Sequence, residues 1–144
     1  MGLALWGRSS TPNLILAPEL GRVTRESLSV YAEPNDTSVI LFQHYRDDIL
    51  HIYKEITSPD GPGYNPVWYR VWGGYVHSSF VQKVKYQLNT LIDKFPSQGQ
   101  LMEVTVPYSQ SYRHRVNEAW EKFYRLYYSS VHWVFSAKEG PDGL

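Results

Sequence analysis

Short apolar runs, separated by turn residues, follow one another along the chain from about residue 21. The clearest alternation is LHIYKEI, residues 50–56, which predicts a strand with Leu50, Ile52 and Ile56 on one face. Shorter apolar runs lie on both sides of a Glu-Pro-Asn-Asp turn that precedes it. Short strands divided by turn residues indicate a mostly β fold.

The stretch WYRVWGGYVHSSFVQ, residues 68–82, combines aromatic residues with a double glycine. Alternation puts Trp68, Arg70 and Trp72 on one face of a strand. The glycines at 73–74 predict a tight hairpin of the primed type, because glycine reaches positive φ without steric cost. The stretch therefore predicts two paired strands, followed by a tight turn at its two serines.

The segment after this hairpin is ambiguous, because residues 80–95 fit both a helical period and a strand alternation. We expect an extended connection here. PSQG, residues 96–99, then marks the strongest internal boundary, because proline and glycine interrupt regular structure.

The chain then repeats itself. YRDDILHIYKEITSPDG, residues 45–61, is echoed about 80 residues later by YRLYYSSVHWVFSAKEGPDG, residues 124–143. The echo predicts two copies of one supersecondary unit, with His51 and His132 at equivalent places. No counterpart of residues 68–82 follows the second copy, so we expect this copy to be incomplete. Either it docks on the first copy or the chain is a piece of a longer protein, and we favour the second explanation.

Composition narrows the function classes. Fourteen basic residues balance fourteen acidic ones, which disfavours nucleic acid as a partner. The chain has no cysteine, which excludes disulfides and thiolate chemistry within it. The 15% aromatic content, with twelve Tyr and five Trp, suits small β domains, where each ring covers much of a thin core. No apolar run is long enough for a transmembrane segment.

The polar residues do not form a recognisable catalytic motif. The five histidines lack metal-ligand spacing, so we expect neither a metal nor a cofactor. Asp47 and Asp48 are adjacent, and neighbouring side chains on a strand point to opposite faces, so we interpret both as turn residues. The serine pairs at 78–79 and 129–130 fit turns better than nucleophiles. We therefore assign no catalytic residue.

These residues carry a resemblance to a known family. Residues 68–71, WYRV, and 74–78, GYVHS, match the closing pattern of bacterial Src-homology-3-like (SH3b-type) modules, and residues 28–34, LSVYAEP, match its opening pattern loosely. Tyr31 and Glu33 depart from that opening pattern. Over about residues 19–144 the chain is similar to the tandem modules that precede the catalytic domain of exported YkuD-type L,D-transpeptidases.

The resemblance implies an organisation and a location. We expect a loose N-terminal leader at 1–20, an SH3-like barrel at 21–85, a linker at 86–98 and a truncated second SH3-like repeat at 99–144. It also implies a place in the cell envelope, next to a C-terminal catalytic domain. The Ser-His-Gly-Cys segment of that domain is absent here, so the chain is not expected to be an enzyme unless it is a fragment of one.

The aromatic residues supply the candidate binding site. We predict that a row of aromatic rings with an arginine forms a shallow cleft for peptidoglycan or its stem peptide. Packing in a core or between modules is the simpler alternative role for these rings, and a rigid spacer is then the alternative role for the module. A second functional hypothesis is an interaction module that binds an extended or proline-rich peptide of a partner protein. The candidate residues are Tyr31, Trp68, Arg70, Trp72 and Tyr75.

Overall fold

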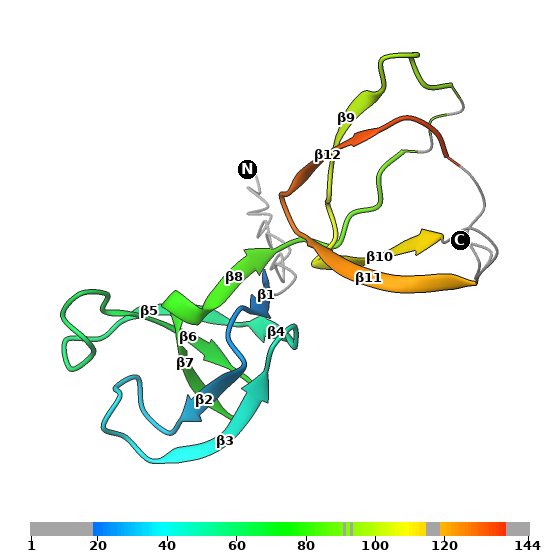
Figure 1. Cartoon of the computed structure of the whole chain (residues 1–144). Coiled ribbons are helices and arrows are strands. Elements are labelled where there is room, and N and C mark those ends of the chain that lie inside the picture. Colours follow the sequence, from blue (N-terminus) through cyan, green and yellow to red (C-terminus); the bar gives the residue numbers. More distant parts are fainter. Residues whose placement is uncertain (1–18, 91, 93, 115–118, 138–144) are drawn as a thin grey trace, which may run out of the picture.

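The computed structural model describes residues 19–90, 92, 94–114 and 119–137, and within them the protein is mostly β, as predicted (Figure 1). Most of the expected leader, residues 1–18, lies outside the described residues. The elements are β1 (Glu19–Val23), β2 (Ser27–Tyr31), β3 (Ile40–Tyr45), β4 (Ile49–Ile52), β5 (Lys54–Thr57), β6 (Val67–Val71), β7 (Gly74–His77), a 3-10 helix η1 (Ser78–Phe80), β8 (Val81–Val84), β9 (Gln100–Glu103), β10 (Tyr108–His114), β11 (Trp120–Tyr127) and β12 (Val131–Val134).

Strands β1 to β8, called the first unit, form two antiparallel sheets. One sheet has the order β3-β2-β7-β6-β5 and the other the order β4-β1-β8. The sheets enclose a core in which Val23, Val30 and Val76 are fully buried. Alternation explains this, because inward residues such as Leu28 and Val30 are separated by the outward Ser29. Closure of the two sheets into a barrel stays a prediction.

The predicted strand at 50–56 is interrupted at Tyr53, which separates β4 from β5. Leu50 and Ile52 lie in the core, as predicted. Ile56 pairs with Trp68, on the opposite face from the core residue Tyr69, so the prediction for Ile56 is wrong. The break at Tyr53 shifts the alternation by one residue, and a one-residue shift reverses the face of every following side chain.

The hairpin between β6 and β7 also differs from the prediction. Val71 pairs with Gly74, so the two turn residues are Trp72 and Gly73. Gly73 has a positive φ of 77°, but Trp72 does not. A primed turn requires a positive φ at the first of the two turn residues, here Trp72, so this turn is not of the primed type. Gly74 is required for another reason: a Cβ there would lie 2.4 Å from the carbonyl oxygen of Tyr31. The absent side chain lets β7 approach β2.

Strands β9 to β12, called the second unit, form two two-stranded antiparallel sheets, β12-β9 and β10-β11. The segment 80–95, predicted to be an extended connection, instead begins with the end of η1 and with β8, which pairs with β1. Only the described residues between β8 and β9 have no regular element. This connection lies against the second unit, because the Gln87 amide donates to the Thr105 carbonyl at 3.1 Å.

The second unit reproduces the pairing of the first four strands. β1 pairs with β4 as β9 pairs with β12, and β2 pairs with β3 as β10 pairs with β11. The turn after the third strand of each set holds a non-glycine residue at positive φ, Asp47 at 70° and Ser129 at 66°. Their amides donate to the corresponding carbonyls of Val23 and Val104, at 3.0 and 2.8 Å. The boundaries of the predicted domains stay a prediction.

The same register corrects the predicted equivalence of two histidines. His132 lies opposite Met102, and the corresponding pair in the first unit is Leu50 with Gly21. His51, in contrast, lies opposite Leu20. The counterpart of His132 is therefore the core residue Leu50, and the predicted match of His132 with His51 is wrong by one position.

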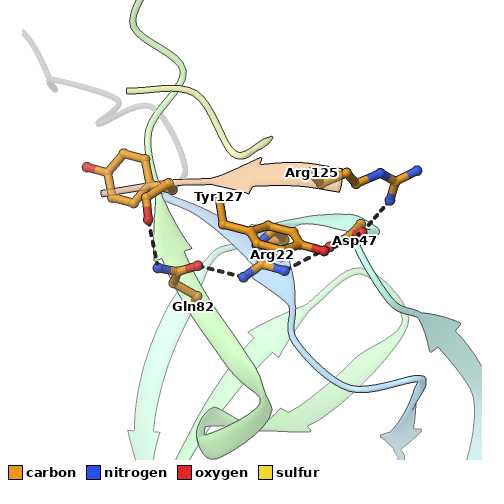
Figure 2. Close-up of polar contacts among 6 residues, drawn as sticks. Arg22, Asp47, Gln82, Arg125 and Tyr127 are labelled. Atoms are coloured by element: carbon orange, nitrogen blue, oxygen red, sulfur yellow. Dashed lines mark hydrogen bonds and ion pairs between the residues drawn. The ribbon is translucent and has the colours of Figure 1, made fainter. Parts of the chain in front are cut away.

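The two units meet at Asp47, a buried residue in the turn between β3 and β4 (Figure 2). Its carboxylate accepts a hydrogen bond from Arg22 of β1 at 2.8 Å and another from Arg125 of β11. The ring of Tyr127 lies 4.2 Å from the Arg22 guanidinium, and Gln82 links that guanidinium to the Tyr128 carbonyl. One carboxylate thus joins two arginines from different units, which places β11 against the β1 sheet.

Candidate functional site

Two of the five predicted binding residues, Tyr31 and Trp68, lie together on the face of the five-stranded sheet that points away from the core. Tyr31 comes from β2 and Trp68 from β6. Their rings meet edge to face, with centroids 5.5 Å apart and planes at 89°. Trp68 is completely buried, although it is not part of the core cluster.

Arg70 and Tyr75 share this outer face, as predicted for Arg70 and Trp68, because Tyr75 pairs with both Tyr31 and Arg70, but neither of them lines the same pocket. Trp72 is 73% exposed at the hairpin tip, and its ring centroid lies 5.8 Å from that of Phe42. The Arg70 guanidinium lies 5.0 Å from the Tyr75 ring and donates to the Gly74 carbonyl at 3.0 Å. Four of the five predicted residues therefore share one sheet face, but only Tyr31 and Trp68 line a common pocket, and Trp72 lies apart at the hairpin tip.

That pocket has a volume of about 230 Å³ and opens beside β2. Most of its wall consists of residues that the sequence reasoning missed. A signal was present, because Pro62 and Tyr64 belong to the loop SPDGPGYNP, residues 58–66, which lies directly before Trp68. The lining residues are Arg25, Ser27, Leu28, Ser29, Tyr31, Asp36, Pro62, Tyr64, Trp68, His77 and Phe80.

Loop 58–66 is held on the sheet by Asn65. The Asn65 side-chain amide donates to the hydroxyls of Ser78 and Ser79, at 3.0 and 2.8 Å, while its carbonyl oxygen accepts from the Val67 amide. Because one side chain satisfies three partners, the loop has a defined path. That path brings the loop over Trp68.

The indole of Trp68 carries a buried donor without a partner. Its Nε1 has no hydrogen-bond partner among the described residues. Gly61 lies directly against this atom, because a Cβ at Gly61 would be 2.6 Å from Nε1. A buried N–H group without an acceptor costs about 1–3 kcal/mol relative to a satisfied one. Such an atom at a pocket is a candidate ligand contact.

His77 carries the complementary group. Its Nε2 is 2.8 Å from the Asn65 main-chain carbonyl, so Nε2 bears the proton and donates. In the neutral ring, Nδ1 is then an acceptor, and this buried atom has no partner among the described residues. The His77 ring packs edge to face on Trp68, with centroids 5.0 Å apart. Two residues that line the pocket thus carry one unused donor and one unused acceptor, and both atoms are buried.

Two charged residues of opposite sign stand at this pocket. Arg25 lies over the Phe80 ring at 4.3 Å and, within the part of the chain that the structure describes, has no carboxylate in ion-pair distance. Asp36 likewise has no cation at that distance among those residues. Both side chains are exposed and available to a charged ligand.

Metal binding and nucleophilic catalysis each need a particular grouping of side chains. No group of three His, Asp or Glu residues that could hold a metal occurs among them. The closest serine–histidine contact is Ser130 Oγ to His132 Nε2, at 2.9 Å. The single hydroxyl proton of Ser130 is donated to the Tyr127 carbonyl at 2.6 Å, so His132 donates to the oxygen instead of accepting from it. This pair is not a nucleophile with its base.

Comparison with known proteins adds no assignment. No family model, no curated protein and no solved structure matches this chain. Within the described ranges, none of the helical structure is long and apolar enough to cross a membrane.

Proposed function

We propose that the chain is a non-catalytic peptide-binding module of the bacterial cell envelope and that it binds the stem peptide of peptidoglycan in the pocket beside Tyr31 and Trp68. The observation that carries the proposal is the unused pair of Trp68 Nε1–H and His77 Nδ1, two buried atoms of residues that line the pocket. A peptide group presents one acceptor and one donor, which complement these two atoms.

The charges at the pocket fit the same ligand. Stem peptides contain free carboxylates and an amino group, and Arg25 and Asp36 are complementary to them. Both protein side chains are exposed, so pairing would require little desolvation. We infer that the charged residues select the ligand while the aromatic residues supply contact area.

Binding to the two buried atoms requires loop 58–66 to shift, because Gly61 covers Trp68 Nε1. The loop is attached mainly through the hydrogen bonds of Asn65, and it contains no buried large apolar side chain. A loop held by few contacts opens at low free energy. The proposal therefore includes a small displacement of the loop on binding.

A second candidate ligand is a proline-rich peptide of a partner protein. It is favoured by the aromatic lining, since Tyr31, Tyr64 and Phe80 accompany Trp68 in one pocket. Extended proline-rich segments dock in aromatic-lined grooves because their conformation is preformed. This ligand needs no charge partner, so it depends on Arg25 much less than a stem peptide does.

The test compares exposed pocket residues with an exposed residue outside the pocket. Tyr64 is 80% exposed and Trp72 is 73% exposed, so neither Tyr64→Ala nor Trp72→Ala should unfold the protein. We expect Tyr64→Ala and Arg25→Gln to reduce co-sedimentation with purified peptidoglycan sacculi at least about fivefold, and Trp72→Ala to leave it unchanged. Sedimentation that is lost only in Trp72→Ala would contradict the proposed site.

A parallel titration separates the two ligands. Binding to a proline-rich peptide, without sedimentation with sacculi, would support the second candidate. Absence of both would leave the pocket without a peptide ligand and would contradict the proposed function.

A further inference from the structure

The outer face of the β1–β4 pair is the surface on which the second unit sits. The register places Leu20 opposite His51 and Arg22 opposite Ile49, so these four side chains share the face that points away from the core. Tyr127 covers the Arg22 end of this face by stacking on the guanidinium at 4.2 Å, and Arg125 reaches Asp47 at its rim, while Ile49 and His51 stay exposed (Figure 2). An arginine and an aromatic ring two residues apart on β11 thus make the contact.

None of the described residues covers the corresponding face of the second unit, on β9 and β12. Its register places Leu101 opposite Trp133 and Glu103 opposite Val131. The three apolar members are all exposed: Leu101 by 55%, Val131 by 51% and Trp133 by 60%. A group of exposed large apolar side chains around one charged residue is typical of an interaction surface.

Two polar residues at this face correspond in position to the Arg22–Asp47 pair of the first unit. Glu103 corresponds to Arg22, and Ser129 corresponds to Asp47. The Ser129 hydroxyl donates to Glu103 Oε1 at 2.7 Å, so the two positions contact each other in both units. Among the described residues Glu103 has no basic partner within ion-pair distance. Each of the two faces therefore has one carboxylate, and the Asp47 carboxylate is paired with two arginines whereas that of Glu103 has no cation among the described residues.

We propose that the outer face of β9 and β12, formed by Leu101, Glu103, Val131 and Trp133, is a docking surface for a further β module that presents an arginine and an aromatic ring on one strand, as β11 does. Charge complementarity carries this choice, because an arginine would pair with the unpaired Glu103 carboxylate and an aromatic ring would bury the exposed apolar side chains around it. The proposal does not depend on the peptide pocket, which lies on the other sheet of the first unit.

A second copy of this chain fits the surface less well. The arginine and tyrosine of β11 are already engaged with Asp47 and Arg22 within the same chain. A second copy would have to break this contact to offer the same groups. We therefore assign the surface to a module whose strand is not used in this way.

The test uses the whole chain and a peptide that copies the known contact, acetyl-Tyr-Arg-Leu-Tyr-Tyr-amide, the sequence of residues 124–128. We expect a weak complex, with a dissociation constant on the order of 1 mM, because a short flexible peptide loses conformational entropy on binding. Amide and indole NMR shifts should map to Leu101, Glu103 and Trp133. Glu103→Gln should weaken binding at least about fivefold.

A charge exchange sharpens the result. Glu103→Arg should abolish binding of this peptide and allow binding of acetyl-Tyr-Glu-Leu-Tyr-Tyr-amide, while Glu26→Gln in the first unit should change neither. Three outcomes would overturn the proposal: no binding at 10 mM peptide (about ten times the expected constant), shifts that map to Arg22 and Asp47, or binding that is insensitive to Glu103. A Glu103-dependent dimer of the unliganded chain, seen by sedimentation, would assign the surface to a second copy instead.

Discussion

The two units share strand pairing and turn geometry, yet they differ in what their inward positions contain. Leu28 and Leu50 are buried in the core of the first unit. The residues at the corresponding positions of the second unit are Ser109 and His132, and neither is buried. The same backbone pattern therefore exists with an apolar interior in one unit and a partly polar one in the other.

The difference follows from how each unit is completed. In the first unit β6, β7 and β8 enclose the inward face, and an unsatisfied polar side chain there would be costly. In the described part of the second unit the two small sheets have no further strands, so inward polar groups keep access to water. The pairing of four strands determines the backbone arrangement in both units. Whether further strands cover the inward face determines which side chains are tolerated there.

The largest expected difference between the units concerns their tryptophans. Trp68→Ala should destabilise the first unit by about 3–5 kcal/mol, because it removes a fully buried ring and leaves a cavity. Trp133→Ala should change stability by less than about 0.5 kcal/mol, because this ring is 60% exposed. Denaturant unfolding of the two variants measures both values. Equal losses would show that Trp133 is covered in solution.

The next effect concerns the contact between the units. Asp47→Ser introduces the residue type of its counterpart, Ser129, and leaves the buried Arg22 without a carboxylate partner. This change should lower the free energy of unfolding by about 3 kcal/mol. Arg125→Gln keeps the Arg22–Asp47 pair and changes a solvent-exposed side chain, so it should destabilise the protein much less. It should nevertheless loosen the second unit, seen as a broader distance distribution between spin labels on the two units. Arg113→Gln is the matched control, because it removes an ion pair with Glu121 and a ring contact with Phe123, both within the β10–β11 pair.

A smaller effect is expected at a glycine whose counterpart is a methionine. A Cβ at Gly21 would lie 2.4 Å from Val81 Cγ1, so Gly21→Ala should cost about 1–3 kcal/mol through overpacking. Met102 takes the corresponding place in the second unit, where Met102→Ala should cost less. Hydrogen exchange of β1 and β9 amides separates the two responses. If the two substitutions lower the protection of their own strands equally, the two interiors are packed equally tightly, which would contradict the difference between the units.

The smallest effect is a loss of stability at alkaline pH, confined to the first unit. Burial raises the pKa of Tyr69 above its ordinary value of 10.0, and ion pairs with Glu19 and Glu55 raise the pKa of Lys83 above 10.5. Raised values mean that the folded state holds these protons more tightly, so the stabilisation is complete below about pH 10 and is lost as the pH rises further. Absorbance titration of tyrosine with parallel unfolding curves measures it. Lys83→Gln should remove part of the dependence, and an unchanged curve would contradict its assignment to Lys83.

Alternation and glycine placement predicted much of the fold. The mostly β class, the strand around Leu50 and the paired strands around the double glycine follow from local residue patterns, which report backbone preferences directly. The face of Ile56 did not follow, because the break at Tyr53 depends on the bond between the Tyr53 amide and the distant Arg70 carbonyl. Long-range contacts of this kind leave no local pattern.

The candidate site was predicted only in part. Tyr31 and Trp68 were identified as aromatic residues on a strand face, but the pocket also needs Arg25 from a β1–β2 turn and Tyr64 from a loop. The contact at Asp47 was missed, since the residue was interpreted as part of an ordinary turn. Its role depends on Arg22 and Arg125, which come close only when both units are folded.

The most direct test of the proposed function is an NMR titration of the intact chain with a soluble stem peptide, following the Trp68 indole N–H. We predict a progressive shift of this signal and of the Gly61 amide, because the ligand must engage Nε1 and displace the loop that covers it. The Trp133 indole signal should stay in place. A Trp68 signal that does not move at saturating peptide, or shifts confined to the exposed Trp72, would contradict the proposed site and the function that depends on it.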